Sequence, residues 1–361
     1  MNSKTIINVA GLSGYAGSSA ITEWLRGNSE CFSFGEYEVP IFRGDGGLLE
    51  LYQLIQTGDV FLCSFAVEKF ILMRERIKCE LLLSPSYPHL EGKYLSLLDY
   101  YKVNIDVDDA LSKIWNEFLS ALFIQTPTKH IFGGFLKGAV GLRCKNYRYP
   151  NTSLKNIAIN ILIRLAEKLN GNYYLATEYN ASQKSSYYFV KHYDKQKLKK
   201  SINILLNEFF NLFTKKRIVV CEQFVYPQTA IMKYDLLDNV KHILVQRDLR
   251  DVFVLCVRRG WICDDDVESF IATSKMRCFM KKEDLSRMQN VKLVRFEDFV
   301  LDHEKETDVL CGFLNISQKG TNSPGYDLEY SKSRIGLYKT YPNQKIISKI
   351  ESELSNFICR E

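Results

Sequence analysis

The sequence predicts an α/β protein with a three-layer core, in which a mostly parallel sheet lies between helices. Short apolar runs rich in Val, Ile and Leu recur along the chain, as in parallel strands that are buried on both faces. Helical patterns separate these runs, and that alternation favours a parallel sheet. A turn of small residues follows the first run, which makes this first turn P-loop-like.

The predicted elements follow one another along the chain. Apolar runs predict five strands, at 5–10, 59–65, 217–223, 241–246 and 291–296. Amphipathic patterns predict the clearest helices, at 18–27, 107–123, 151–170, 195–213 and 343–358. The stretch from about 66 to 215 is rich in helical patterns and poor in strand signals. We therefore expect residues 1–361 to form a single domain with a helix-rich insertion at about 66–215.

Composition limits the compartment and the class of protein. Ten cysteines are spread over the 361 residues without a CxxC pair, which favours free thiols and a reducing compartment over disulfides or structural zinc. The opening apolar run is too short for a signal peptide, and the run at 114–124 contains Asn116 and Glu117 and is too short for a membrane span. The expectation is a cytoplasmic protein with no metal site and no membrane span.

Positive charge is concentrated in the middle of the chain. The net charge is +6, but residues 137–217 contain 16 Lys or Arg against 4 Asp or Glu. This excess indicates either a solvated helical face or a surface for anionic ligands. No nucleic-acid-binding motif accompanies it, so we do not expect a nucleic-acid partner.

The turn GLSGYAGSSA, at 11–20, links the first predicted strand to the first predicted helix. Gly14 and Gly17 allow the backbone to approach a bound anion closely, and the N–H groups at the helix start add partial positive charge. The hydroxyls of Ser18 and Ser19 are additional donors. The turn therefore predicts a site for a phosphate-like anion. Its predicted binding residues are Ser13, Gly14, Tyr15, Ala16, Gly17, Ser18 and Ser19.

This turn departs from the loop of ATPases. The Walker pattern GxxxxGK[ST] requires Gly where Leu12 stands and Lys where Ser18 stands. That lysine contacts the β- and γ-phosphates of a nucleoside triphosphate. Its absence favours a nucleotide with a shorter and less charged tail.

A second polar cluster follows the predicted strand at 241–246. The stretch VQRDLRDV places Arg247 directly at the carboxyl end of that strand, the edge where ligands bind in α/β folds. A guanidinium offers a planar pair of donors that suits a phosphate group. The alternative is an Arg–Asp network that only stabilises the strand–helix junction.

These features together resemble the sulfotransferases that use 3′-phosphoadenosine 5′-phosphosulfate. Residues 15–19 match the family's [KR]-S-G-T-T loop, VQRDLRDV matches its V-R-D-P-R-D-V stretch, and NVKLVRFEDFVLD at 290–302 resembles its late strand. The stretch SKSRIGLYKTY at 331–341 resembles its late nucleotide-binding loop, with Lys332, Ser333, Arg334 and Gly336 at the matching positions. The four pieces occur in the family's order, and residues 66–215 match nothing in it.

The resemblance implies a sulfotransferase-like domain that moves a sulfuryl group from 3′-phosphoadenosine 5′-phosphosulfate to a hydroxyl acceptor. It implies that the loop binds the 5′-phosphosulfate and that Arg247 binds the 3′-phosphate. Two positions depart from the pattern. Tyr15 stands where the loop usually has a cation, and Leu255 stands where a Ser usually follows the Arg by eight residues. The replacement cation is left open among Lys332, Arg334, Arg43 and a lysine of the basic middle segment.

The proton acceptor is also left open. The segment SFGEYEVP, at 33–40, resembles a G-E-E segment that carries a catalytic Glu in some family members, so Glu36 and Glu38 are the predicted catalytic residues. His89 and His130 are the histidine alternatives because both lie in predicted loops.

The acceptor is a second open question. Tyrosines at 173–190 and the basic excess favour a glycan or glycolipid acceptor, with a sterol-like or other hydrophobic alcohol as the alternative. Two other functions remain open beside the sulfotransferase. One is a small-molecule kinase, and the other is a non-catalytic relative that only binds the nucleotide.

Overall fold

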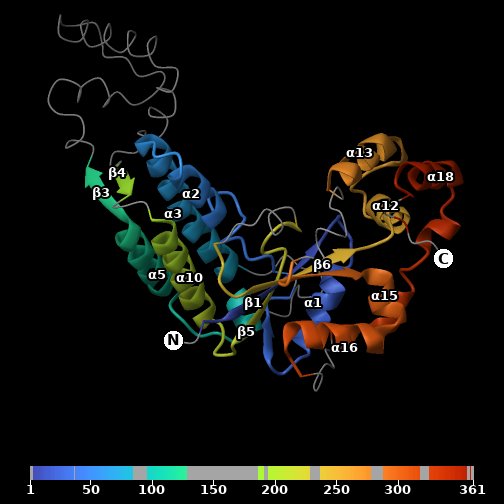
Figure 1. The fold of residues 1–361 in the computed structure, drawn as a ribbon, viewed down its shortest axis with the longest axis horizontal. Coiled ribbons are helices and arrows are strands. Elements are labelled where there is room, and N and C mark those ends of the chain that lie inside the picture. Colours follow the sequence, from blue (N-terminus) through green and yellow to red (C-terminus); the bar gives the residue numbers. More distant parts are fainter. Residues whose placement is uncertain are drawn as a thin grey trace, which may run out of the picture. The chain divides into compact units, whose positions relative to one another are not determined.

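The structure is a computed structural model that describes residues 3–35, 37–83, 96–127, 186–190, 194–227, 236–277, 288–317, 325–355 and 358. The chain divides into two compact units, Met1–Phe42 with Leu206–Glu361, and Arg43–Leu205. Figure 1 shows the elements of both units. The first unit contains the sheet, and the second is mostly helical.

The sheet of the first unit has five parallel strands in the order β2-β5-β1-β6-β7. Its strands are β1 (Thr5–Gly11), β2 (Cys31–Ser33), β5 (Ile218–Glu222), β6 (Val240–Gln246) and β7 (Val291–Arg295). All five carboxyl ends meet at one edge because every pairing is parallel. The predicted α/β class with a mostly parallel sheet is confirmed.

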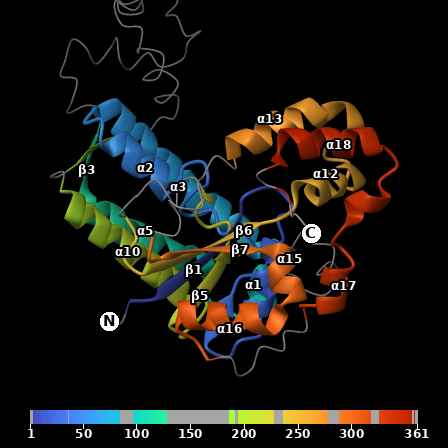
Figure 2. The ribbon, with the colours of Figure 1, turned by 45° about the vertical axis from the view of Figure 1, so that its right-hand side comes forward.

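Two hydrophobic cores cover the two faces of this sheet. Successive strand side chains point to opposite faces, and β6 follows that rule: Ile243 and Val245 join one core, whereas Leu244 joins the other. The first core also contains side chains of α1, α15 and α16, and the second contains side chains of α12, α13 and α18. Figure 2 shows α12, α13 and α18 grouped together, apart from α15 and α16.

The remaining elements of the first unit lie between or after its strands. They are α1 (Ser18–Arg26), α12 (Leu249–Arg258), η1 (Asp264–Asp266), α13 (Val267–Arg277), α15 (Phe296–Leu301), α16 (His303–Leu314), α17 (Leu328–Lys332), η2 (Leu337–Thr340) and α18 (Gln344–Glu353). The helices predicted at 18–27 and 343–358 correspond to α1 and α18. The helix predicted at 151–170 lies outside the described residues.

One strand prediction is wrong. The run DVFLCSF, predicted as a strand at 59–65, consists of the N-cap residue and the first six residues of the helix α3 (Val60–Leu82). Asp59 caps this helix, since its side chain accepts hydrogen bonds from the N–H groups of Phe61 (2.8 Å) and Leu62 (3.0 Å). A short apolar run does not distinguish a strand from a buried helix, and the cap decides this case.

The second unit packs its helices around α3. Its elements are α2 (Leu48–Ile55), α3, α4 (Leu97–Tyr101), α5 (Val107–Leu122), β3 (Phe123–Pro127) and β4 (Ser186–Val190), and α10 (Lys195–Asn211) crosses the boundary between units. The rings of Phe70 and Trp115 stack with centroids 5.2 Å apart, and Trp115 Nε1 donates to the Phe70 carbonyl at 2.9 Å. The single-domain expectation with its insertion at 66–215 stays a prediction. None of the described helices is both long enough and apolar enough to cross a bilayer.

A buried polar pair joins the two central strands. The side-chain amide of Asn8 in β1 lies 3.1 Å from Nδ1 of His242 in β6. Both residues are buried, and burial lowers the pKa of His242 from 6.5 to about 4. His242 is therefore neutral in the folded protein at neutral pH.

This lowered pKa predicts an acid-sensitive stability. Between pH 6.5 and about 4 the unfolded chain binds the His242 proton and the folded chain does not, so stability falls as pH falls through that window. We expect the wild type to lose about 3 kcal/mol more than His242→Gln between pH 7 and pH 4. Urea unfolding at several pH values measures this difference, and parallel pH curves for the two proteins would contradict it.

Candidate functional site

The small-residue loop lies at the carboxyl edge of the sheet, between β1 and α1. Tyr15 (φ 56°) and Gly17 (φ 92°) both adopt the left-handed backbone conformation, which turns the chain sharply into the helix. Gly17 is the N-cap residue of α1 and has no side chain with which to cap it, so no N-cap side chain occupies the first N–H groups of the helix. This geometry is suitable for an anion.

Gly17 is tightly enclosed by the element that follows β7. A Cβ atom at Gly17 would lie only 2.2 Å from the ring of Phe296, the first residue of α15. The same ring lies under the guanidinium of Arg247, whose Cζ is 4.4 Å from the ring centroid. Phe296 therefore contacts both predicted halves of the nucleotide site.

Arg247 points toward the loop from the end of β6. Its Nη1 donates to the Tyr15 carbonyl at 3.4 Å, and its Nη2 donates to the carbonyl of Arg334. Only 4% of Arg247 is exposed, and its buried Nε has no hydrogen-bond partner. Burial lowers the pKa of Arg247, whereas the carboxylates of Asp251 and Glu297 act in the opposite direction. The carboxylate of Asp251 lies 3.9 Å from Nη2 of Arg247.

Asp251, in the first turn of α12, binds residues 334–338, which we call the late segment. Its carboxylate accepts hydrogen bonds from the backbone N–H groups of Gly336 (2.8 Å) and Tyr338 (3.1 Å). Burial raises the pKa of Asp251, while these two hydrogen bonds and Arg247 act in the opposite direction. The structure therefore brings together three segments that are distant in sequence: the loop, the end of β6, and residues 334–338.

Arg250 provides a useful contrast with Arg247. It is also buried, but it pairs with the side chain of Asp248 at 2.8 Å and with Glu351 at 3.3 Å. Its guanidinium also lies over the ring of Tyr338, at 3.8 Å from the centroid. Arg250 therefore has a structural role at the start of α12. The Arg–Asp network that the sequence offered as an alternative role for Arg247 is formed by Arg250.

An aromatic and cationic surface covers the middle of the loop. The rings of Tyr15 and Trp261 pack with centroids 4.2 Å apart, and Trp261 also lies next to Gly14. Trp261 is 64% exposed, and its backbone N–H donates to the Cys256 carbonyl in the last turn of α12. Burial raises the pKa of Tyr15, and the charge of Arg259 acts in the opposite direction. The charge of Arg259, the residue after α12, therefore acts on the residue that replaces the expected loop cation.

The remaining predicted residues have varied positions. Ser18 and Ala16 are buried, and Ser13, Gly14 and Ser19 are half-buried. Lys332 and Ser333 are exposed and bond within their own turn, to Glu329 and to the Tyr330 carbonyl. Leu255, at the position of the expected serine, is buried in α12. Glu38 is exposed, whereas Glu36, His89 and His130 lie outside the described residues.

One acidic residue at this edge was missed. Glu222, the last residue of β5, is 8% exposed, and its Oε1 accepts a 2.6 Å hydrogen bond from the hydroxyl of Ser18. The signal was present in the sequence, because the predicted strand at 217–223 ends in Glu-Gln at the same edge as Arg247. Arg247 was predicted as a site residue because it lies at the carboxyl end of a strand, and Glu222 meets the same criterion.

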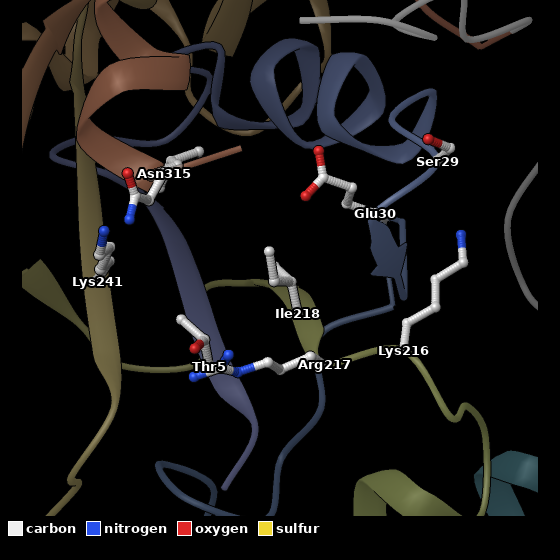
Figure 3. Close-up of a pocket in the computed structure, with 9 residues that line it drawn as sticks. Thr5, Ser29, Glu30, Lys216, Arg217, Ile218, Lys241 and Asn315 are labelled. Carbon is white, nitrogen blue, oxygen red and sulfur yellow. The ribbon is translucent and has the colours of Figure 1, made fainter. Parts of the chain in front are cut away.

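A separate hollow lies at the opposite edge of the sheet. It has a volume of about 480 Å³ and is lined by Thr5 and Ile218, where β1 and β5 begin, and by Lys241 near the start of β6. Figure 3 shows the lysine and arginine side chains around it. This hollow is not part of the candidate site, because the loop lies where the strands end.

Comparisons with known proteins give structural matches only. No family model matches the chain, and no curated protein matches it. A sulfotransferase domain from the Synechococcus PCC 7002 olefin synthase matches with a TM-score of 0.41 and 11% identity, over 98% of this chain and 95% of that one. A sulfotransferase domain from the curacin biosynthetic pathway matches with a TM-score of 0.38 and 16% identity, over 98% of both chains. At this level of similarity, the assignment of a function rests on the geometry of the site.

The contact between Gly17 and Phe296 predicts the effect of a single methyl group. Gly17→Ala introduces a Cβ into the Phe296 ring and adds the cost of the left-handed backbone, about 1–2 kcal/mol. We expect a lower melting temperature and the loss of anion binding, measured by calorimetry. Gly58→Ala is the matched control, because Gly58 has a φ of 69° with nothing within 4 Å of its Cβ position. Equal effects of the two substitutions would contradict the role of the Phe296 contact.

Proposed function

We propose that the protein is a sulfotransferase that transfers a sulfuryl group from 3′-phosphoadenosine 5′-phosphosulfate to a hydroxyl acceptor. The acceptor class proposed is a glycan or glycolipid, with a sterol-like or other hydrophobic alcohol as the alternative. The observation that carries this proposal is the buried guanidinium of Arg247, which bonds to carbonyls of the loop and of the late segment and keeps one unpartnered N–H group. A buried donor without a partner is costly unless a ligand satisfies it.

The residues present fit the donor. In this proposal the N–H groups of the loop and of the α1 start bind the 5′-phosphosulfate, and Arg247 with residues 334–336 binds the 3′-phosphate. The bound donor supplies a sulfuryl group on a phosphate leaving group. The protein orients the donor, stabilises the charge that develops on the leaving phosphate and accepts the acceptor's proton.

The expected loop cation has a candidate replacement in this proposal. The charge of Arg259 opposes the rise in the pKa of Tyr15, the residue that stands at the position of the expected cation. Lys332, an earlier candidate, is paired with Glu329 at 2.7 Å. We propose Arg259 as the cation that stabilises the leaving phosphate, and Arg334, whose charge acts on the pKa of Arg247, is the alternative within the same unit.

Ligand-dependent thermal melts test the proposal against its alternatives. Adenosine 3′,5′-bisphosphate at 100 times its Kd stabilises a protein that binds it by about 2.7 kcal/mol, and we expect the melting temperature to rise accordingly. ATP with magnesium tests the kinase alternative, so a rise with ATP alone would overturn the proposal. Binding of the bisphosphate without turnover of labelled donor across glycan and sterol panels would identify a non-catalytic relative.

Arg247→Ala tests the assignment of the 3′-phosphate. A hydrogen bond to a charged group is worth about 1.5–3 kcal/mol, so we expect the affinity for adenosine 3′,5′-bisphosphate to fall roughly 10- to 100-fold. The affinity for adenosine 5′-monophosphate should change little, because that nucleotide lacks the 3′-phosphate. Isothermal titration calorimetry with both nucleotides measures the difference.

Arg250→Ala is the control for this experiment. Arg250 is also buried, but its donors already pair with Asp248 and Glu351. The loss of the Arg250 side chain should lower the stability of the protein and change the affinities for the two nucleotides by the same factor. If Arg247→Ala behaved in the same way, Arg247 would be a structural residue and not a ligand for the 3′-phosphate.

A further inference from the structure

A buried carboxylate lies directly at the proposed anion loop. The hydroxyl of Ser18, the first residue of α1, donates to Oε1 of Glu222 at 2.6 Å, and the two residues are 7% and 8% exposed. Ser18 has a single hydroxyl proton, and this bond uses it. While Glu222 is ionised, Ser18 therefore orients the carboxylate and does not donate to a bound anion.

The backbone around Glu222 has a well-defined position. Glu222 pairs with Val9 of β1 in the sheet register, and the N–H of Gln223 donates to the Val9 carbonyl at 2.9 Å. The side-chain amide of Asn8 then bonds to both backbone groups of Val225, at 2.9 and 3.0 Å. Gln223 between them has a φ of 51°, a conformation that non-glycine residues rarely adopt outside tight turns and functional sites.

A carboxylate at this place opposes the function of the loop. A negative charge next to an anion site weakens anion binding, and a site built only to hold the donor gains nothing from it. The sulfuryl transfer reaction, however, needs a proton acceptor beside the reacting atoms. Glu38, one of the two bases predicted from the sequence, is exposed, whereas Glu222 is bonded to the loop itself.

We propose that Glu222 is the catalytic base that accepts the proton of the acceptor hydroxyl, an inference that rests on the proposed sulfotransferase function. The acceptor oxygen forms a bond to sulfur, and the bond between sulfur and the 5′-phosphate oxygen breaks with its electron pair leaving on the phosphate. The hydroxyl proton moves to the carboxylate of Glu222. Ser18 is a positioning residue, because its hydrogen bond orients that carboxylate.

Glu222→Gln tests the proposal with two independent measurements. The amide keeps an oxygen that accepts from Ser18 but cannot take up the proton and has no charge. We expect the affinity for adenosine 3′,5′-bisphosphate to rise roughly 3- to 10-fold because the repulsion is removed. We expect the release of adenosine 3′,5′-bisphosphate from the donor, with water or an added phenol as acceptor, to fall roughly 100-fold or more.

One control variant and two further variants show whether the effect of Glu222→Gln is specific to this carboxylate. Glu304→Gln removes an exposed carboxylate from α16 and should change neither measurement. Ser18→Ala leaves the carboxylate in place but removes the hydrogen bond that orients it, so the turnover should fall. The affinity for the bisphosphate should not rise in this variant, because the charge of Glu222 is still present. If Glu222→Gln does not fold, Glu222→Asp is the second variant, because it keeps the acidic group on a shorter side chain. A turnover of Glu222→Asp equal to that of the wild type would then contradict the requirement for an oriented carboxylate.

Several outcomes would overturn the proposal. Wild-type turnover in Glu222→Gln with a loss of turnover in Glu36→Gln would place the base at Glu36. If Glu222→Gln bound the bisphosphate more weakly and melted at a lower temperature than the wild type, Glu222 would be a structural residue. Binding that requires magnesium and is lost in Glu222→Gln would make it a cation ligand. Bisphosphate binding by a wild type that consumes no donor would also overturn it, whereas a wild type that does not bind the bisphosphate contradicts the proposed function itself.

Discussion

The arrangement of the candidate site depends on one buried guanidinium. Arg247 lies at the end of a central strand with 4% of its surface exposed, and it donates to backbone carbonyls of the loop and of the late segment. Burying a charge is costly, and carbonyl dipoles with a carboxylate 3.9 Å away compensate only part of that cost. The guanidinium therefore links two segments and retains a capacity to bind an anion, which connects the packing of the core to the proposed chemistry.

The packing around Arg247 is specific to this arrangement. Phe296 fills the space between Gly17 and the guanidinium, and no side chain fits at position 17 beside that ring. Asp251 holds the late segment by two backbone N–H groups, and its own burial is tolerated because those hydrogen bonds compensate for it. The loop, the strand end and the late segment are thus fixed by contacts within one compact unit.

Groups of opposite charge lie at the carboxyl edge of the sheet. Arg247 and the N–H groups of the loop favour an anion, while Glu222 disfavours it and is bonded to Ser18 of the same loop. Such a combination is expected for group transfer, where one part of a site binds a charged donor and another removes a proton. The aromatic pair of Tyr15 and Trp261 covers the middle of the loop and is exposed on the side of Trp261.

The sequence alone determined the α/β class, four of the five sheet strands, the loop at 11–20 and the place of Arg247, because these depend on local hydrophobic patterns and on the rule that parallel strands end at one edge. It did not determine that DVFLCSF begins a helix, since a short apolar run fits either element and the Asp59 cap decided it. The short strand β2 was also beyond sequence patterns, because its three residues carry no period. Only the tertiary structure paired Glu222 with Ser18 and left Arg247 with an unpartnered N–H group, because both depend on contacts between residues that lie far apart in the chain.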